Sequence, residues 1–270
     1  MLGKLLKYEF KSTARVFLPL YITILVVALI NGFSINSNLF KIQGLLIMIF
    51  GALMIALFVI TIIVIVQRFS KNLLGDEGYL MFTLPVGNTS VLFSKYLVAL
   101  LWTILSGIVA FVAFFLIALI PLFLEGGFDF MYWLGSVKEL FGLLFYGAEF
   151  RFIMSMFLLA FLSYSIFIFS VYLALSMGQL PTFNKHRNLA SFISFIGINV
   201  VFSFIQNLVA GLYLGVNGEN ILLQIETDAV SGISNLVSNG FWISILFSAL
   251  TLAMLFFATK FILDKKLNLE

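Results

Sequence analysis

The chain of 270 residues is predicted to be an all-α integral membrane protein with six transmembrane helices. Hydrophobic residues make up 62% of it, charged residues only 10%, and the mean hydropathy is +1.15. A soluble domain with a wetted surface does not reach these values. The apolar residues form six stretches long enough for the roughly 20 residues that cross a bilayer core as a helix. Because the stretches are continuously apolar, without alternation, a β-barrel with a polar lumen is excluded.

The first predicted element is an amphipathic helix over residues 1–15. One face carries Leu2, Leu5, Leu6, Phe10 and Thr13, and the other carries Lys4, Lys7, Lys11 and Arg15. This distribution is typical of a helix lying in the membrane interface. No small-residue cleavage site follows, so the segment is not expected to be a signal peptide. We expect the helix to anchor the chain at the inner interface or to contact a cytoplasmic partner.

Six spans follow, and with the amphipathic helix they form one predicted transmembrane domain, residues 1–270. The expected spans are residues 16–33, 42–66, 96–124, 152–175, 189–216 and 241–263. Residues 125–151, between the third and fourth spans, are too aromatic for a solvated loop and are expected at the outer interface. Residues 217–239, between the last two spans, are expected to form a short helix that turns back toward the bilayer.

The basic residues predict the orientation. With the N-terminus inside, twelve of the fifteen basic residues are cytoplasmic: Lys4, Lys7, Lys11, Arg15, Arg68, Lys71, Lys95, Lys185, Arg187, Lys260, Lys265 and Lys266. Only Lys41, Lys138 and Arg151 fall outside. The positive-inside rule therefore places both termini in the cytoplasm. The basic inner rim follows from membrane insertion and does not predict a nucleic-acid partner.

No catalytic, cofactor-binding or metal-binding residues are predicted, and we do not expect the chain to be an enzyme. It has no cysteine, and its one histidine, His186, lies beside other basic loop residues rather than in a cluster. Metal-dependent membrane enzymes need clusters of His, Glu or Asp at helical spacing. No charged residue lies at the centre of a span, which argues against an ion-coupled transporter or a channel lined by charged rings.

The fifth span carries a polar face. Asn199, Ser203, Gln206 and Asn207 lie at i, i+4, i+7 and i+8, within an arc of about 100°. Amides in hydrocarbon need partners, so this face is expected to look into the bundle, a subunit interface or a watered cavity. Two interpretations stay open: hydrogen bonds that hold helices together, and the lining of a substrate pathway.

The inner segment between the second and third spans predicts a short cytoplasmic helix. Asp76 and Glu77 suit a helix N-terminus, and Pro85 ends the helix. Between them lie Tyr79, Leu80, Met81, Phe82 and Leu84. This apolar surface either packs back onto the inner ends of the spans or binds a partner.

With these residues in view, the chain resembles the permease subunits of ATP-binding cassette (ABC) exporters of the second type. The residues that carry the resemblance are Asp76, Glu77, Gly78, Tyr79, Leu80, Phe82, Leu84, Pro85, Val86 and Lys95. Tyr79 departs from the pattern, in which a small hydroxyl residue is commoner. The resemblance implies that residues 76–84 form the coupling helix that docks on an ATPase subunit and that Leu2 to Ala14 form the connecting helix. It also implies that the second inner loop, with Lys185, His186 and Arg187, contacts that subunit.

The resemblance implies an ATP-driven exporter. The chain has no Gly-x-x-x-x-Gly-Lys-Ser/Thr loop to cradle phosphates, so ATP and magnesium are expected on separate cytoplasmic ABC ATPase subunits. We expect two such subunits and a second permease chain, identical or homologous. Two alternatives remain, a membrane scaffold that does not transport and a secondary transporter.

The cargo and location are expected from the family and the composition. Cargoes of the family include antimicrobial peptides, lipids, drugs and polysaccharide precursors, and a pathway without fixed charges favours an amphipathic or hydrophobic cargo. The Phe-, Ile- and Asn-rich composition with little Ala indicates an AT-rich bacterial genome. We therefore expect a multi-pass protein of a bacterial plasma membrane.

Overall fold

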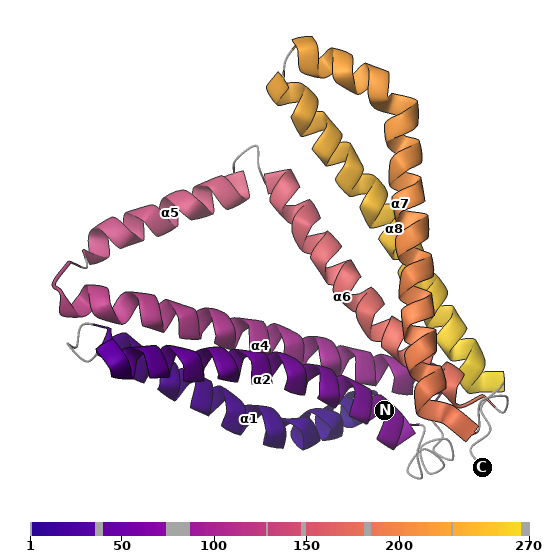
Figure 1. Cartoon of the computed structure of the whole chain (residues 1–270), viewed down its shortest axis with the longest axis horizontal. Helices are drawn as coiled ribbons and strands as arrows, with labels where there is room; N and C mark the ends of the chain where they lie inside the picture. Colours follow the sequence, from indigo (N-terminus) through magenta and orange to yellow (C-terminus); the bar gives the residue numbers. More distant parts are fainter. Residues whose placement is uncertain are drawn as a thin grey trace. The chain divides into compact units, whose positions relative to one another are not determined.

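The computed structural model describes residues 2–35, 40–73, 87–127, 129–146, 150–180, 185–227 and 229–265. In chain order these ranges hold α1 (Leu2–Ser34), α2 (Phe40–Leu73), α4 (Asn88–Leu124), α5 (Phe130–Tyr146), α6 (Phe150–Gly178), α7 (Arg187–Thr227) and α8 (Ala229–Lys265) (Figure 1). Every helix except α5 contains a stretch long and apolar enough to cross a membrane. The all-α class and the six predicted spans are confirmed by this length and composition.

The predicted amphipathic helix and the first span form one continuous helix, α1. The reason is a single buried stripe that keeps helical spacing from one segment into the other. Its buried members are Glu9, Thr13, Phe17, Tyr21, Ile24, Ala28 and Asn31. Lys7, Lys11 and Arg15 lie on the exposed side of the same helix. The predicted break near residue 15 is therefore absent, and of the residues assigned to the apolar face Thr13 is buried and Phe10 is exposed.

The contacts between helices group the chain into two compact units, residues 1–137 and 138–270. In the first unit α1 packs along α4 and also contacts α2. Phe17, Ile24, Phe50, Leu57 and Trp102 belong to its buried core. Gly32 permits close approach of α1 to α4, since a Cβ atom there would lie 2.8 Å from Ile120 Cδ1 and 3.1 Å from the Leu116 carbonyl oxygen.

In the second unit α6, α7 and α8 pack against one another. Phe169 of α6 meets Phe256 of α8 edge to face, with ring centroids 5.6 Å apart. At the C-terminus of α6, Gly178 lies against Ser191 and the Arg187 carbonyl oxygen, where a Cβ atom would collide with both. The close approach of α6 to the start of α7 at Gly178 therefore requires glycine.

The two predicted outer segments are helical. Within residues 125–151 the structure has α5, whose first turn is capped by the Asp129 carboxylate: it accepts bonds from the backbone N–H of Met131 at 2.9 Å and of Tyr132 at 3.2 Å. The short helix expected in residues 217–239 is not a separate element, because α7 continues to Thr227 and α8 begins at Ala229. No proline lies in this part of the sequence to end either helix earlier.

Candidate functional site

The predicted coupling helix, Asp76 to Leu84, lies outside the described residues, but the helices on both sides of it are described. Helix α2 continues to Leu73 and α4 begins at Asn88, with the Ser90 N–H bonded to the Gly87 carbonyl oxygen at 2.8 Å. Compared with the predicted spans, each helix extends by about two more turns, or roughly 10 Å, toward the segment that is predicted to be inside. These two extensions are the stems that carry the inner segment.

Both stems meet one carboxylate on α1. Lys95 Nζ, on the α4 stem, donates a hydrogen bond to Glu9 Oε1 at 2.8 Å. Arg68, on the α2 stem, lies 3.6 Å from Glu9 Oε2 and donates to Ser12 Oγ at 2.6 Å. The Lys95 side chain is only 1% exposed and that of Glu9 10%. We call Glu9, Arg68 and Lys95 the stem cluster.

The stem cluster links its helices by charge, with Lys95 and Glu9 buried and Arg68 25% exposed at its edge. A buried ion pair gains little net stability over an apolar pair, because both charges must be desolvated. Removing one partner is far more costly, since the other charge stays buried alone. We call this arrangement the lock: removal of any one of its three charged side chains is expected to destabilise the contact between α1, α2 and α4.

A stacked aromatic layer continues the contact between α1 and α4. Trp102 lies between Phe10 and Phe17, with both ring-centroid distances 4.6 Å and interplanar angles of 12° and 11°. Its indole Nε1–H donates to Thr13 Oγ1 at 2.6 Å. One turn further, the Tyr21 hydroxyl lies 2.8 Å from Ser106 Oγ. Because these contacts are directional as well as apolar, they fix the register of α1 along α4.

Sequence reasoning missed Glu9 and Trp102. It counted Lys95 in the basic inner rim and among the residues that carry the family resemblance, but did not predict its buried ion pair. The signal was present: Glu9 lies four residues before Thr13 and eight before Phe17, on the stripe of the first span. This spacing predicts a buried Glu9 only if the helix continues through residue 15. A helix broken there separates Glu9 from that stripe.

The second predicted inner contact is a surface feature. Lys185 and His186 form an exposed single turn just before α7, and Arg187, which begins α7, is half-buried. The Arg187 carbonyl oxygen accepts a bond from Ser191 Oγ at 3.0 Å. These residues belong to the second unit, and their predicted partner contact stays a prediction.

The four residues of the predicted polar face lie on α7, and the two asparagines among them bond to backbone carbonyls of the same helix. Asn199 Nδ2 donates to the Phe195 carbonyl oxygen at 2.8 Å and Asn207 Nδ2 to that of Ser203 at 2.9 Å, both within α7. The side chains of Ser203, Gln206 and Asn207 are exposed. The bonds that these two asparagines make are thus within one helix rather than between helices.

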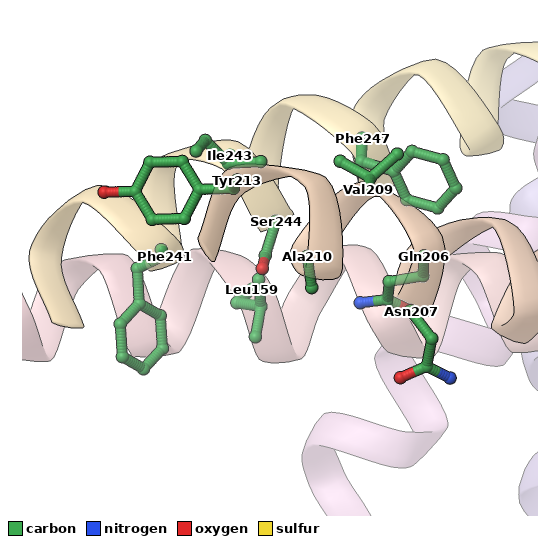
Figure 2. Close-up of a pocket in the computed structure, with 11 residues that line it drawn as sticks. Leu159, Gln206, Asn207, Val209, Ala210, Tyr213, Phe241, Ile243, Ser244 and Phe247 are labelled. Atoms are coloured by element: carbon green, nitrogen blue, oxygen red, sulfur yellow. The ribbon is translucent and has the colours of Figure 1, made fainter. Parts of the chain in front are cut away.

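Gln206 and Asn207, but neither of the other two, line a pocket in the second unit. The pocket has a volume of about 450 Å³, lies between α6, α7 and α8, and is partly open to the outside of the unit (Figure 2). Leu159, Ala210 and Phe247 supply apolar wall, and Ser244 adds a hydroxyl group. No charged side chain is among the described residues that line it. It is an apolar pocket with a few neutral hydrogen-bonding groups, the composition typical of a small-molecule site.

Two places in the described chain therefore go beyond helix packing: the stem cluster in the first unit and the pocket in the second. Comparison of the chain with protein-family models, with curated proteins and with solved structures found no match.

Proposed function

We propose that this chain is the transmembrane permease subunit of an ATP-driven exporter of the ABC type-2 class. The observation that carries the proposal is the stem cluster, in which one buried carboxylate of α1 joins the helix entering the inner segment to the helix leaving it. A segment that only connects two spans does not need both of its stems tied to a third helix. A segment that receives force from an ATPase needs such a tie, because the force must pass from the segment to the other helices.

The proposed mechanism begins at the inner segment. In this account the segment Asp76 to Leu84 docks on a cytoplasmic ABC ATPase subunit, with Lys185, His186 and Arg187 as a second contact. Closure of two ATPase subunits on ATP and magnesium pushes the segment. Because Arg68 and Lys95 share Glu9, displacement of either stem also displaces α1. The three helices then move as one body between inward-open and outward-open states.

The proposed exporter also contains a second permease chain. Two permease chains, identical or homologous, form the pathway in a bacterial plasma membrane, with their termini in the cytoplasm. The chain itself binds no nucleotide. Its amphipathic first turns, Leu2 to Ala14, act as the connecting helix at the inner interface. The described start of α1 supports this with basic residues on its exposed side and the stem cluster on its buried side.

A paired substitution at the inner segment tests the proposal. Leu80→Asp with Phe82→Asp places two charges on the surface that is proposed to enter the ATPase groove, where desolvating them is costly. We expect the permease to lose co-purification with the ATPase subunit, and substrate-stimulated ATP hydrolysis with it. The matched control is Met131→Asp with Tyr132→Asp in α5, outside the six apolar spans, where both side chains are exposed.

The expected control result is retained ATPase binding. If the Leu80 and Phe82 variant keeps both the complex and the stimulated hydrolysis, the coupling role is wrong. If a complex forms with an ATPase but no cargo is ever transported, the chain is instead a membrane scaffold.

A further inference from the structure

We infer that the pocket between α6, α7 and α8 binds an uncharged amphiphile, with a carbonyl or hydroxyl group against Gln206 and Ser244 and a hydrocarbon chain against Leu159 and Phe247. The pocket geometry carries this inference without reference to the motor. That the amphiphile is cargo rests on the proposed function.

The first argument is the polar groups that face the pocket. Figure 2 shows the Gln206 amide nitrogen and the Ser244 hydroxyl oxygen directed into the space beside Leu159 and Ala210. Within the described part of the chain neither side chain has a hydrogen-bond partner. The amide of Asn207, at the rim, uses its nitrogen on the Ser203 carbonyl oxygen, which leaves Oδ1 as an acceptor. In a membrane such groups are costly unless something bonds to them.

The second argument is depth. Gln206 lies about two turns before Tyr213, where the apolar span of α7 ends, and Ser244 lies one turn after Gly240, where the span of α8 begins. The pocket is therefore near the α7–α8 end of the spans, which the positive-inside orientation predicts to be the outer half of the bilayer. At this depth the hydrocarbon part of a membrane amphiphile meets its polar head group.

The third argument is chemistry and size. The described lining has no charge to balance a charged ligand, and an unpaired ion is strongly disfavoured in such surroundings. Phe241, Ile243 and Phe247 give α8 a broad apolar wall. A volume of about 450 Å³ is many times the roughly 30 Å³ share of one water molecule. An acyl chain with an ester or amide carbonyl satisfies all three conditions.

Photolabelling of the purified full chain in phosphatidylcholine nanodiscs tests the site. The probe is a monoacylglycerol with a diazirine near its ester, and the labelled peptides are identified by mass spectrometry. We expect label concentrated near Leu159, residues 206–213 and residues 240–247. Gln206→Leu should raise the half-saturating probe concentration about 5- to 10-fold, because one hydrogen bond to the probe is lost. Ala210→Phe, which fills the pocket, should abolish the focused label.

The matched controls are Ser203→Ala and Ala253→Phe, both at exposed positions outside the described lining. They should leave the label unchanged. The inference is overturned if label spreads evenly over the lipid-facing helices, or if neither Gln206→Leu nor Ala210→Phe alters it. It is also overturned if a diazirine alkylammonium of equal chain length labels the same peptides equally well.

Two bilayer compositions identify the source of the ligand. If the natural occupant is a membrane lipid, nanodiscs that contain diacylglycerol, which is uncharged, compete with the probe, and nanodiscs that contain its diether analogue, which lacks ester carbonyls, do not. If it is a cargo, the label is equal in both bilayers and the unlabelled monoacylglycerol stimulates ATP hydrolysis. Both results support the site. Since the labelling needs no ATPase subunit, failure of the site and failure of the proposed function are seen separately.

Discussion

Replacing Glu9 by leucine is expected to lower the free energy of unfolding by about 3–5 kcal/mol, the cost of leaving a buried charge without its partner. Lys95 would stay 1% exposed after the loss of the Glu9 carboxylate. Arg68, which lies on the other side of the same carboxylate, would then be an uncompensated neighbour of like charge. Equilibrium unfolding in detergent micelles measures the change.

Two further variants decide whether this effect belongs to the stem cluster. Glu139→Leu removes an exposed carboxylate and should change stability by less than about 0.5 kcal/mol. Glu9→Leu combined with Lys95→Met removes both charges and should recover most of the loss, because an apolar pair can replace a buried ion pair. An effect of Glu9→Leu no larger than that of Glu139→Leu would contradict the lock.

Replacing Trp102 by alanine is expected to cost about 3–5 kcal/mol, as for other large aromatic residues truncated in a core. The side chain is 3% exposed and stacks on Phe10 and Phe17 at the same time. Its removal leaves a void between α1 and α4 and deprives Thr13 of a hydrogen-bond donor. Trp102→Phe keeps part of the stack and should cost less, with about 1 kcal/mol of its loss due to the hydrogen bond.

The control for this variant is Trp242→Ala in α8, where the indole is 52% exposed. It should alter the unfolding free energy far less in the same assay. Equal effects of the two alanine variants would show that the aromatic layer does not fix α1 on α4.

The sequence predicted the class and the six spans because a bilayer imposes a strong constraint on length and polarity. It failed at helix ends. The predicted break before residue 16 is absent, and the helix expected as a separate element in residues 217–239 consists of parts of α7 and α8. Polar residues near a span end do not stop a helix when no proline or tertiary contact interrupts it.

The candidate site was predictable only in part. The spacing of Gln206 and Asn207 indicated one polar face, and both do line the pocket. Ser244 and Leu159 come from other helices, so their contribution depends on packing that one helix pattern does not contain. Glu9 and Lys95 are 86 residues apart. A count of basic residues treats each charge as solvated, and such a count cannot detect a buried pair.

The most direct measurement of the central claim is the energy source of transport. Inside-out vesicles carrying the permease and its ATPase subunit would be given a fluorescent monoacylglycerol, with ATP, with a non-hydrolysable analogue, or with an ion gradient alone. The account predicts uptake that requires ATP hydrolysis, persists when ionophores collapse all gradients, and is lost in Leu80→Asp with Phe82→Asp. Uptake that follows an ion gradient without ATP would contradict it.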